Sequence, residues 1–156
     1  TLMRSSAASD VYKRQDKYDA LKLENQLCFP LYAAAKEIVR QYKPFLDRLD
    51  MTYTQYIAMM VLWEHREVTV KELGEYLYLD SGTLTPLLKT MEKKGWVERN
   101  RSKEDERVLI VTITEVGDKL KEKAVCVPEQ MAGCIHLEKE EAIQLYQLLY
   151  KILGKF

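Results

Sequence analysis

The chain has 156 residues, 47% of them hydrophobic, which suits one globular domain with its own core. Its 24 lysine and arginine residues balance 24 aspartate and glutamate residues, so no overall field draws it to nucleic acid or to an anionic membrane. Its three cysteines, without a paired C-x-x-C spacing, argue against a secreted disulfide framework and a zinc site, and no run approaches the roughly 18 apolar residues of a membrane helix. We expect a cytoplasmic protein on which any DNA-binding surface is local.

Residues 1–17 show little hydrophobic periodicity. Their first part, TLMRSSAASDVYKRQ, resembles the translated adaptor scars found on some metagenome-derived sequences. We therefore expect residues 1–17 to be a non-native or disordered tail and residues 18–156 to form the domain.

Helical periodicity begins after this tail. Apolar residues recur at intervals of three and four from Leu27 to Tyr42, which predicts a helix that Pro44 ends or bends. Two capping-box spacings follow, in which a threonine hydroxyl serves the N3 amide and the N3 side chain reaches back. The pairs are Thr52 with Gln55 and Thr69 with Glu72, which predict helices beginning near Tyr53 and Val70.

A short polar turn, LDSGT, separates the helix from Val70 from a further helix. We expect that further helix to begin near Thr83, with Pro86 in its first turn, and to end at Gly95; an earlier start would predict a bend at Pro86. The β-rich segments WVERN and RVLIVTIT then flank the charged tip RSKEDE, as in a β-hairpin. Thr114 is expected to cap another helix, which Pro128 interrupts, and the last segment is again helical.

The order helix, turn, helix and hairpin predicts a winged helix-turn-helix whose second helix, TLTPLLKTMEKKG, lies in the DNA major groove. Basic residues concentrate in this helix and in the hairpin. They are Lys89, Lys93, Lys94, Arg99, Arg101, Lys103 and Arg107. Interleaved glutamates keep open the alternative that this surface is only a solvated charged face. They are Glu92, Glu98, Glu104 and Glu106.

The segment YLDSGTLTPLLKTMEKKGWVERNRSKEDERVLIVTIT resembles the recognition helix and wing of MarR-type repressors, including their Asp-x-Arg element at Asp105 and Arg107. LENQLCFPLY, QYKPFLDRLDMTYTQY and LWEH resemble, more narrowly, the organic hydroperoxide repressors, the OhrR branch. The resemblance extends from about Leu21 to Val127. It implies a mainly α fold, a winged helix-turn-helix with a small β-hairpin wing and N- and C-terminal dimerisation helices. The DNA-binding lobe would span about residues 52–114, and dimerisation would use residues 21–50 and 115–156.

The resemblance further implies a homodimeric repressor that binds a pseudo-palindromic DNA operator and has an organic hydroperoxide as inducer. Its sensor would be Cys28, hydrogen-bonded by Tyr42 and Tyr53 of the partner subunit. The residues around Cys28 agree with this sensor role. Pro30 allows a helix to begin near Phe29, so Cys28 would lie beside the positive end of the helix dipole, a position that favours the thiolate form. The relatives usually carry alanine or leucine where this chain has Pro30, which puts the sensitivity of the sensor in question.

The two other thiols, Cys126 and Cys134, fall where some relatives keep a resolving cysteine that forms the disulfide, whereas others capture a small thiol. Approximate alignment favours Cys134, and simple packing is an equal alternative for each. His65 and His136 have no ligand cluster around them, so we expect no metal, and no cofactor is implied.

The expected DNA contacts fall into two groups. In the major groove, Lys89 and the hydroxyls of Ser81, Thr83 and Thr85 would mix phosphate and base contacts. In the wing, Arg107 would enter the minor groove, with Asp105 and Arg99 as further DNA-binding residues.

Three functions compete for this sequence. The first is the peroxide-sensing repressor. The second is a MarR-type repressor that answers a non-covalent phenolic ligand, with Cys28 as filler. The third is a thiol peroxidase, against which stand the absence of a histidine or arginine motif near Cys28 and the presence of a DNA-reading module. We therefore expect a protein that is not an enzyme.

Overall fold

The computed structural model describes residues 17–155, and these form two compact units, residues 17–42 and residues 43–155. Apart from Lys17, the predicted tail lies outside the described residues. Within residues 17–155, every helix is too short or too polar to cross a lipid bilayer.

The first unit contains two short 3-10 helices, η1 (Asp19–Leu21) and η2 (Leu23–Asn25), and most of the helix α2 (Cys28–Leu46). The start of α2 at Cys28 confirms the predicted start near Phe29. Pro30 is therefore the third helical residue, where a backbone amide would have no partner in any case. The sequence left open whether Pro44 ends or bends this helix. It does not end it, because α2 continues to Leu46 with Pro44 inside its last turn.

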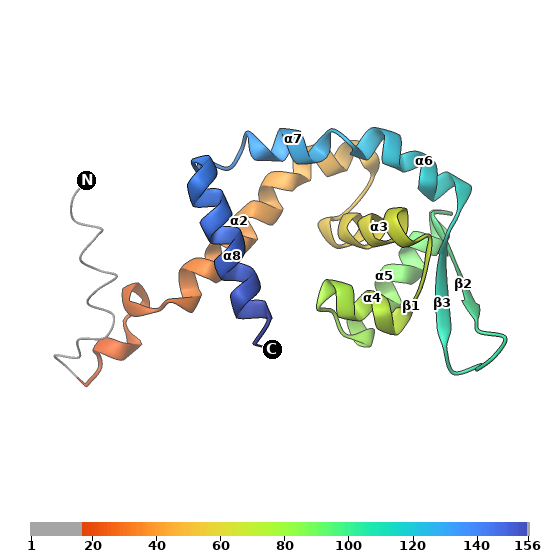
Figure 1. Ribbon diagram of the computed structural model, residues 1–156, viewed down its shortest axis with the longest axis horizontal. Coiled ribbons are helices and arrows are strands. Elements are labelled where there is room, and N and C mark those ends of the chain that lie inside the picture. Colours follow the sequence, from red (N-terminus) through yellow and green to blue (C-terminus); the bar gives the residue numbers. More distant parts are fainter. Residues whose placement is uncertain (1–16, 156) are drawn as a thin grey trace. The chain divides into compact units, whose positions relative to one another are not determined.

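The second unit is mainly helical and carries a three-stranded antiparallel sheet (Figure 1). Its helices are, in chain order, η3 (Asp47–Leu49), α3 (Tyr53–His65), α4 (Val70–Leu77), α5 (Ser81–Lys93), α6 (Glu115–Ala124), α7 (Val127–Ala132) and α8 (Lys139–Leu153). Its strands are β1 (Glu67–Thr69), β2 (Val97–Arg101) and β3 (Leu109–Ile113), in the order β1-β3-β2. The hairpin of β2 and β3 is the predicted wing, and it projects past the short strand β1, which the sequence did not predict. The winged helix-turn-helix is confirmed.

Local capping explains where the helices begin. Thr52 Oγ1 accepts a hydrogen bond from the Gln55 amide at 3.3 Å, and Gln55 Oε1 accepts one from the Thr52 amide at 3.1 Å. The same reciprocal pair joins Thr69 and Glu72, with distances of 3.1 and 2.7 Å. Thr114 likewise caps α6, since its hydroxyl accepts from the Gly117 amide at 3.0 Å. All three predicted helix starts are confirmed.

The connection between α4 and α5 differs from the prediction. Asp80, not a residue near Thr83, is the N-cap of α5, and its carboxylate accepts from the Thr83 amide at 2.8 Å. The helix thus begins at Ser81, and Gly82 lies in its first turn instead of in the preceding turn. Because Pro86 is now the sixth helical residue, it removes one i to i−4 backbone hydrogen bond inside α5.

The end of α5 is as predicted. Gly95 has a φ of +75°, a left-handed conformation that glycine adopts without strain, and the Trp96 amide then donates to the Met91 carbonyl at 3.1 Å. The predicted interruption at Pro128 lies slightly too late, because α6 already ends at Ala124 and Pro128 sits in the first turn of α7, where proline is tolerated.

The core of the second unit is formed by apolar side chains of α3, α4, α5 and the sheet. Its most deeply buried members include Ala58, Met59, Leu62, Leu73, Leu84, Leu88, Met91, Val97 and Val111. Helix α8 contributes no buried residue, and it exposes Ile143, Leu145, Tyr146, Leu148, Tyr150 and Ile152.

Candidate DNA-reading surface and cysteine sites

One face of α5 is polar and exposed. Ser81, Thr85 and Lys89 follow one another at four-residue spacing, so they share one side of the helix, and Thr83 is also exposed. The opposite side is buried, with Leu84 and Leu88 each 1% exposed. The Thr85 hydroxyl donates to the Ser81 carbonyl at 2.8 Å, so outward it offers mainly its acceptor lone pairs. The face thus carries hydroxyl groups and one ammonium group, which suit base edges and phosphates.

Arg107 lies in the loop that joins the wing strands. Its side chain is 91% exposed, and its Nε and Nη2 donate to the two carboxylate oxygens of Asp105 at 3.1 and 3.2 Å. The Arg107 amide also donates to Asp105, at 3.0 Å. These hydrogen bonds hold the pKa of Asp105 below its usual range, and the bonds from the Arg107 side chain are the largest cause. Asp105 therefore stays ionised and orients an exposed guanidinium at the wing.

Arg99 is held by a protein partner. From β2, its Nε and Nη2 donate to one carboxylate oxygen of Glu92 at 3.1 and 2.6 Å, and its amide donates to the other at 3.2 Å. The Arg99 side chain is only 18% exposed. Hydrogen bonding to the Arg99 side chain is also the first cause that lowers the pKa of Glu92. The sequence placed Glu92 only among the glutamates interleaved with the basic residues, and this ion pair was not predicted.

Lys94 is a second cation of the predicted footprint that is engaged inside the protein. Its Nζ pairs with the Asp50 carboxylate at 3.0 Å and lies 4.5 Å from the centre of the Trp96 ring. Lys89, Lys93 and Lys103 form no ion pair with any residue in the range 17–155. The cations available to DNA are therefore fewer than the sequence count implies.

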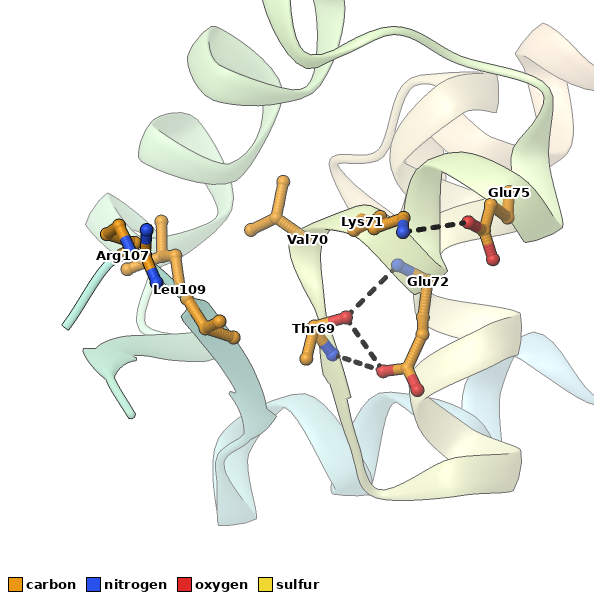
Figure 2. Close-up of a pocket in the computed structure, with 8 residues that line it drawn as sticks. Thr69, Val70, Lys71, Glu72, Glu75, Arg107 and Leu109 are labelled. Carbon is orange, nitrogen blue, oxygen red and sulfur yellow. Dashed lines mark hydrogen bonds and ion pairs between the residues drawn. The ribbon is translucent and has the colours of Figure 1, made fainter. Parts of the chain in front are cut away.

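A groove of about 560 Å³ lies between the N-terminus of α4 and the tip end of the wing, where the loop meets the start of β3. Figure 2 shows the Thr69–Glu72 capping box and the Lys71–Glu75 ion pair on one side, with Arg107 and Leu109 on the other. The backbone amide of Thr69 is the first cause that lowers the pKa of Glu72. Glu72 and Glu75 line the groove together with Lys71 and Arg107, so the formal charges of its lining balance.

Cys28 is the first residue of α2 and is exposed. Tyr42 lies 14 residues further along the same helix, which at 1.5 Å per residue separates the two positions by about 21 Å. Within one chain, Tyr42 therefore cannot donate a hydrogen bond to Cys28. Tyr53 begins α3, and burial raises its pKa, so its phenol keeps the proton that a donor needs.

The two other thiols flank helix α7: Cys126 is its N-cap residue, and Cys134 follows its C-cap residue, Gly133. Cys126 is exposed just beyond α6, and its Sγ is 3.5 Å from the Lys123 carbonyl oxygen. Cys134 is half-buried just beyond α7, and its Sγ is 3.6 Å from the Gln130 carbonyl oxygen. Both thiols thus donate to a backbone carbonyl of the preceding helical turn. No group of metal-ligating side chains occurs among residues 17–155.

Comparison with known proteins identifies the family. A family described as transcriptional regulator SarA/Rot matches residues 40–124. The organic hydroperoxide resistance transcriptional regulator of Bacillus subtilis (strain 168) is 53% identical over 139 residues, 89% of this chain and 95% of the relative. The chain belongs to the MarR family of transcriptional regulators. The predicted place among the organic hydroperoxide resistance regulators of this family is confirmed as well.

Solved structures of another MarR-family regulator, AbfR of Staphylococcus epidermidis, have the same fold. Reduced AbfR bound to DNA superposes with a TM-score of 0.72 at 35% identity, covering 90% of this chain and 98% of AbfR. The disulfide form of AbfR superposes with a TM-score of 0.62 at 34% identity, covering 89% and 95% of the two chains. The protein is thus a DNA-binding transcription regulator of the MarR type.

In this MarR-family regulator, the structure gathers part of the predicted site. The helix residues Ser81, Thr85 and Lys89 share one face, and Asp105 and Arg107 are in contact. Cys28 and Tyr42 are far apart along one helix. The DNA contacts and the sensor role of each residue remain predictions.

Proposed function

We propose that the protein is a homodimeric repressor that binds its operator when reduced and releases it when an organic hydroperoxide oxidises Cys28. The observation that carries this proposal is the position of Cys28. It is an exposed thiol at the N-terminus of a 19-residue helix, where the unpaired amides and the helix dipole stabilise negative charge. Cys126 and Cys134 instead donate to backbone carbonyls.

The proposed chemistry begins with attack of the Cys28 thiolate on the terminal oxygen of the hydroperoxide. The O–O bond breaks, the sulfur is oxidised by two electrons to sulfenic acid, and the alkoxide leaves and takes a proton to become the alcohol. A second thiol then attacks the sulfenic sulfur, forming a disulfide and releasing water. Cys134 is the first candidate for that second thiol, with Cys126 or a small cellular thiol as the alternatives.

Two observations support a dimer. Cys28 and Tyr42 are 14 residues apart along α2, so the proposed hydrogen bond from the Tyr42 phenol to the Cys28 sulfur requires a second copy of the chain. Helix α8 exposes apolar side chains that suit burial against another chain, with Leu148 58% and Ile143 48% exposed. In a two-fold dimer, the two α5 helices would meet successive major grooves about 34 to 36 Å apart, so the operator would be pseudo-palindromic.

The rival proposal is release by a non-covalent phenolic ligand. The groove beside α4 is large enough for such a ligand, but two glutamates line it and Arg107 is already paired with Asp105. Lys71 and Arg107, the two cations that line this groove, are paired with Glu75 and Asp105, so neither is free to bind a phenolate there.

Operator release followed by fluorescence anisotropy separates the two mechanisms. Wild type should release labelled operator within minutes when cumene hydroperoxide is added below one equivalent per subunit, and a reducing thiol should restore binding. Cys28→Ser should stay bound, because serine keeps the size and hydrogen bonding of cysteine but forms no sulfenic acid. Cys126→Ser removes the alternative second thiol and, with Cys134 as the second thiol, should respond as wild type does. Release of Cys28→Ser by hydroperoxide, or release of wild type by a phenol such as salicylate alone, would favour the rival.

A further inference from the structure

The structure assigns a wing-positioning role to the Glu92–Arg99 pair: Glu92 and Arg99 fix the wing to the recognition helix and act on DNA only through the placement of Arg107. This inference rests on the proposed DNA role of Arg107. It changes the expected role of Arg99 from a DNA contact to a positioning residue, and it adds Glu92, which sequence reasoning left out.

The first support is the geometry of the pair. Glu92 lies in the last turn of α5, and Arg99 is the third residue of β2, so the pair spans the turn between helix and wing. Three donors of Arg99 converge on the two oxygens of Glu92, at 2.6, 3.1 and 3.2 Å. A guanidinium bound by two of its nitrogens and anchored by its own backbone amide has little freedom to turn outward.

The second support is the face of β2 on which Arg99 lies. Side chains alternate along a strand, so Arg99 shares the face of Val97, which is 1% exposed and packs in the core. Glu98 lies on the other face and is exposed. The direction of the Arg99 side chain is thus toward the protein, as its 18% exposure also indicates.

The third support is the turn that the pair closes. Gly95 adopts a φ of +75° with no atom beyond its chain neighbours within 4 Å of the place of a Cβ, and its carbonyl accepts a hydrogen bond from the Thr114 hydroxyl at 2.6 Å. The Trp96 amide donates to Met91, and the Glu92–Arg99 pair adds the next tie along the strand. Beyond Arg101 the chain enters the loop that carries Arg107, whose side chain is 91% exposed. A small rotation at the turn would therefore be amplified at Arg107, and a binding side chain tolerates only about 10 to 20° of error.

The two roles of Arg99 predict opposite effects of removing the Glu92 charge. If Arg99 binds a phosphate, Glu92→Gln frees the guanidinium and removes a repulsive charge, so DNA affinity rises. If the pair positions the wing, Glu92→Gln and Arg99→Gln both lower affinity. The two losses should then not add in the double variant, because either change breaks the same interaction.

The test measures operator affinity of the full-length reduced protein across a salt series. We expect Glu92→Gln and Arg99→Gln each to weaken binding by about tenfold, within the range of a coupled pair, with the double variant no weaker than either. Glu98→Gln is the matched control, since it removes the same charge from the outer face of β2 and should not weaken binding. In an Arg107→Ala background, Glu92→Gln should have no further effect, whereas a general loss of structure would persist there.

Hydrogen exchange of the free protein over residues 102–108 gives a readout that does not depend on DNA, and we expect faster exchange in Glu92→Gln at an unchanged thermal midpoint. The inference is overturned if Glu92→Gln tightens binding, or if Arg99→Gln lowers the salt slope by about one phosphate contact. It is also overturned if the Glu92→Gln loss persists without Arg107. If Arg107→Ala does not change operator affinity, the proposed DNA role of the wing tip fails. Hydrogen exchange then decides the positioning role by itself: if Glu92→Gln does not change exchange over residues 102–108, that role is overturned as well.

Discussion

The DNA-reading lobe and helix α8 differ in how far their apolar side chains are buried. In the lobe, each of the helices α3, α4 and α5 carries leucines that are at most 1% exposed: Leu62, Leu73, Leu84 and Leu88. In α8, no residue is buried, and Leu148 is 58% exposed although it recurs with helical spacing among other apolar residues. The lobe is thus complete within one chain, whereas α8 has the pattern of a helix whose partner is another chain.

The same contrast applies to the functional residues. The polar groups of the DNA-reading surface find their orienting partners nearby in the chain, as Arg107 does in Asp105. The proposed sensor does not, because Cys28 and Tyr42 are separated along one helix. Reading DNA would therefore depend on the fold of each chain, and sensing on the assembly of two.

The largest expected effect comes from matched leucines in the two regions. Leu88→Ala should cost about 2 to 5 kcal/mol of unfolding free energy, because it leaves a cavity in the core. It should lower the thermal midpoint at every protein concentration. Leu148→Ala should instead lower the midpoint increasingly on dilution and raise the dimer dissociation constant in sedimentation, since it acts on association. Equal effects of the two variants at all concentrations would contradict the contrast.

A smaller loss is expected at the junction of α6 with the wing. A Cβ on Gly117 would overlap the Trp96 carbonyl, and the Gly117 carbonyl accepts from Trp63 Nε1 at 3.0 Å. Gly117→Ala should cost about 1 to 3 kcal/mol, as overpacking does, and should shift tryptophan fluorescence because both tryptophans lie at this point. Gly133→Ala is the control: its Cβ would meet the Gln130 carbonyl at an ordinary 3.5 Å, so stability should stay within about 0.5 kcal/mol.

The smallest effect concerns the tyrosines, and mixed dimers measure it. The first mixed dimer pairs a Cys28→Ser subunit with a Tyr42→Phe subunit. Its one remaining Cys28 is in the Tyr42→Phe subunit, and the partner of that cysteine still has Tyr42. The second mixed dimer pairs a subunit that carries both changes with a wild-type subunit. Its one remaining Cys28 is in the wild-type subunit, and the partner of that cysteine has phenylalanine at position 42. The second dimer should react with hydroperoxide about threefold to tenfold more slowly, the value of one net hydrogen bond. Equal rates would remove the role of Tyr42 across the interface.

The sequence predicted those parts of the structure that depend on neighbouring residues. The caps at Thr52, Thr69 and Thr114 and the end of α5 at Gly95 follow from local hydrogen bonding and backbone conformation, so they could be predicted. Strand β1 has three residues and exists because it pairs with β3, which lies more than 40 residues later, and no local signal marks it.

Charge pairs were harder to predict than caps. Glu92 and Arg99 lie on different elements, and their contact depends on the turn at Gly95. The sequence therefore showed a mixed charged surface without showing which charges neutralise each other. The position of Cys28 at a helix start was predictable from Pro30. Tyr42 and Tyr53 were named as its neighbours only through the family resemblance, because local residue spacing carries no signal of a second chain.

The most direct test of the account is to identify which thiol the hydroperoxide oxidises first. The reduced protein bound to operator is treated with less than one equivalent of cumene hydroperoxide in the presence of dimedone, and the three cysteines are quantified by mass spectrometry. The sulfenic acid adduct is expected on Cys28, at a rate that matches operator release, while Cys126 and Cys134 carry no adduct. Release of operator with Cys28 still reduced, or with the adduct first on Cys126 or Cys134, would contradict this expectation.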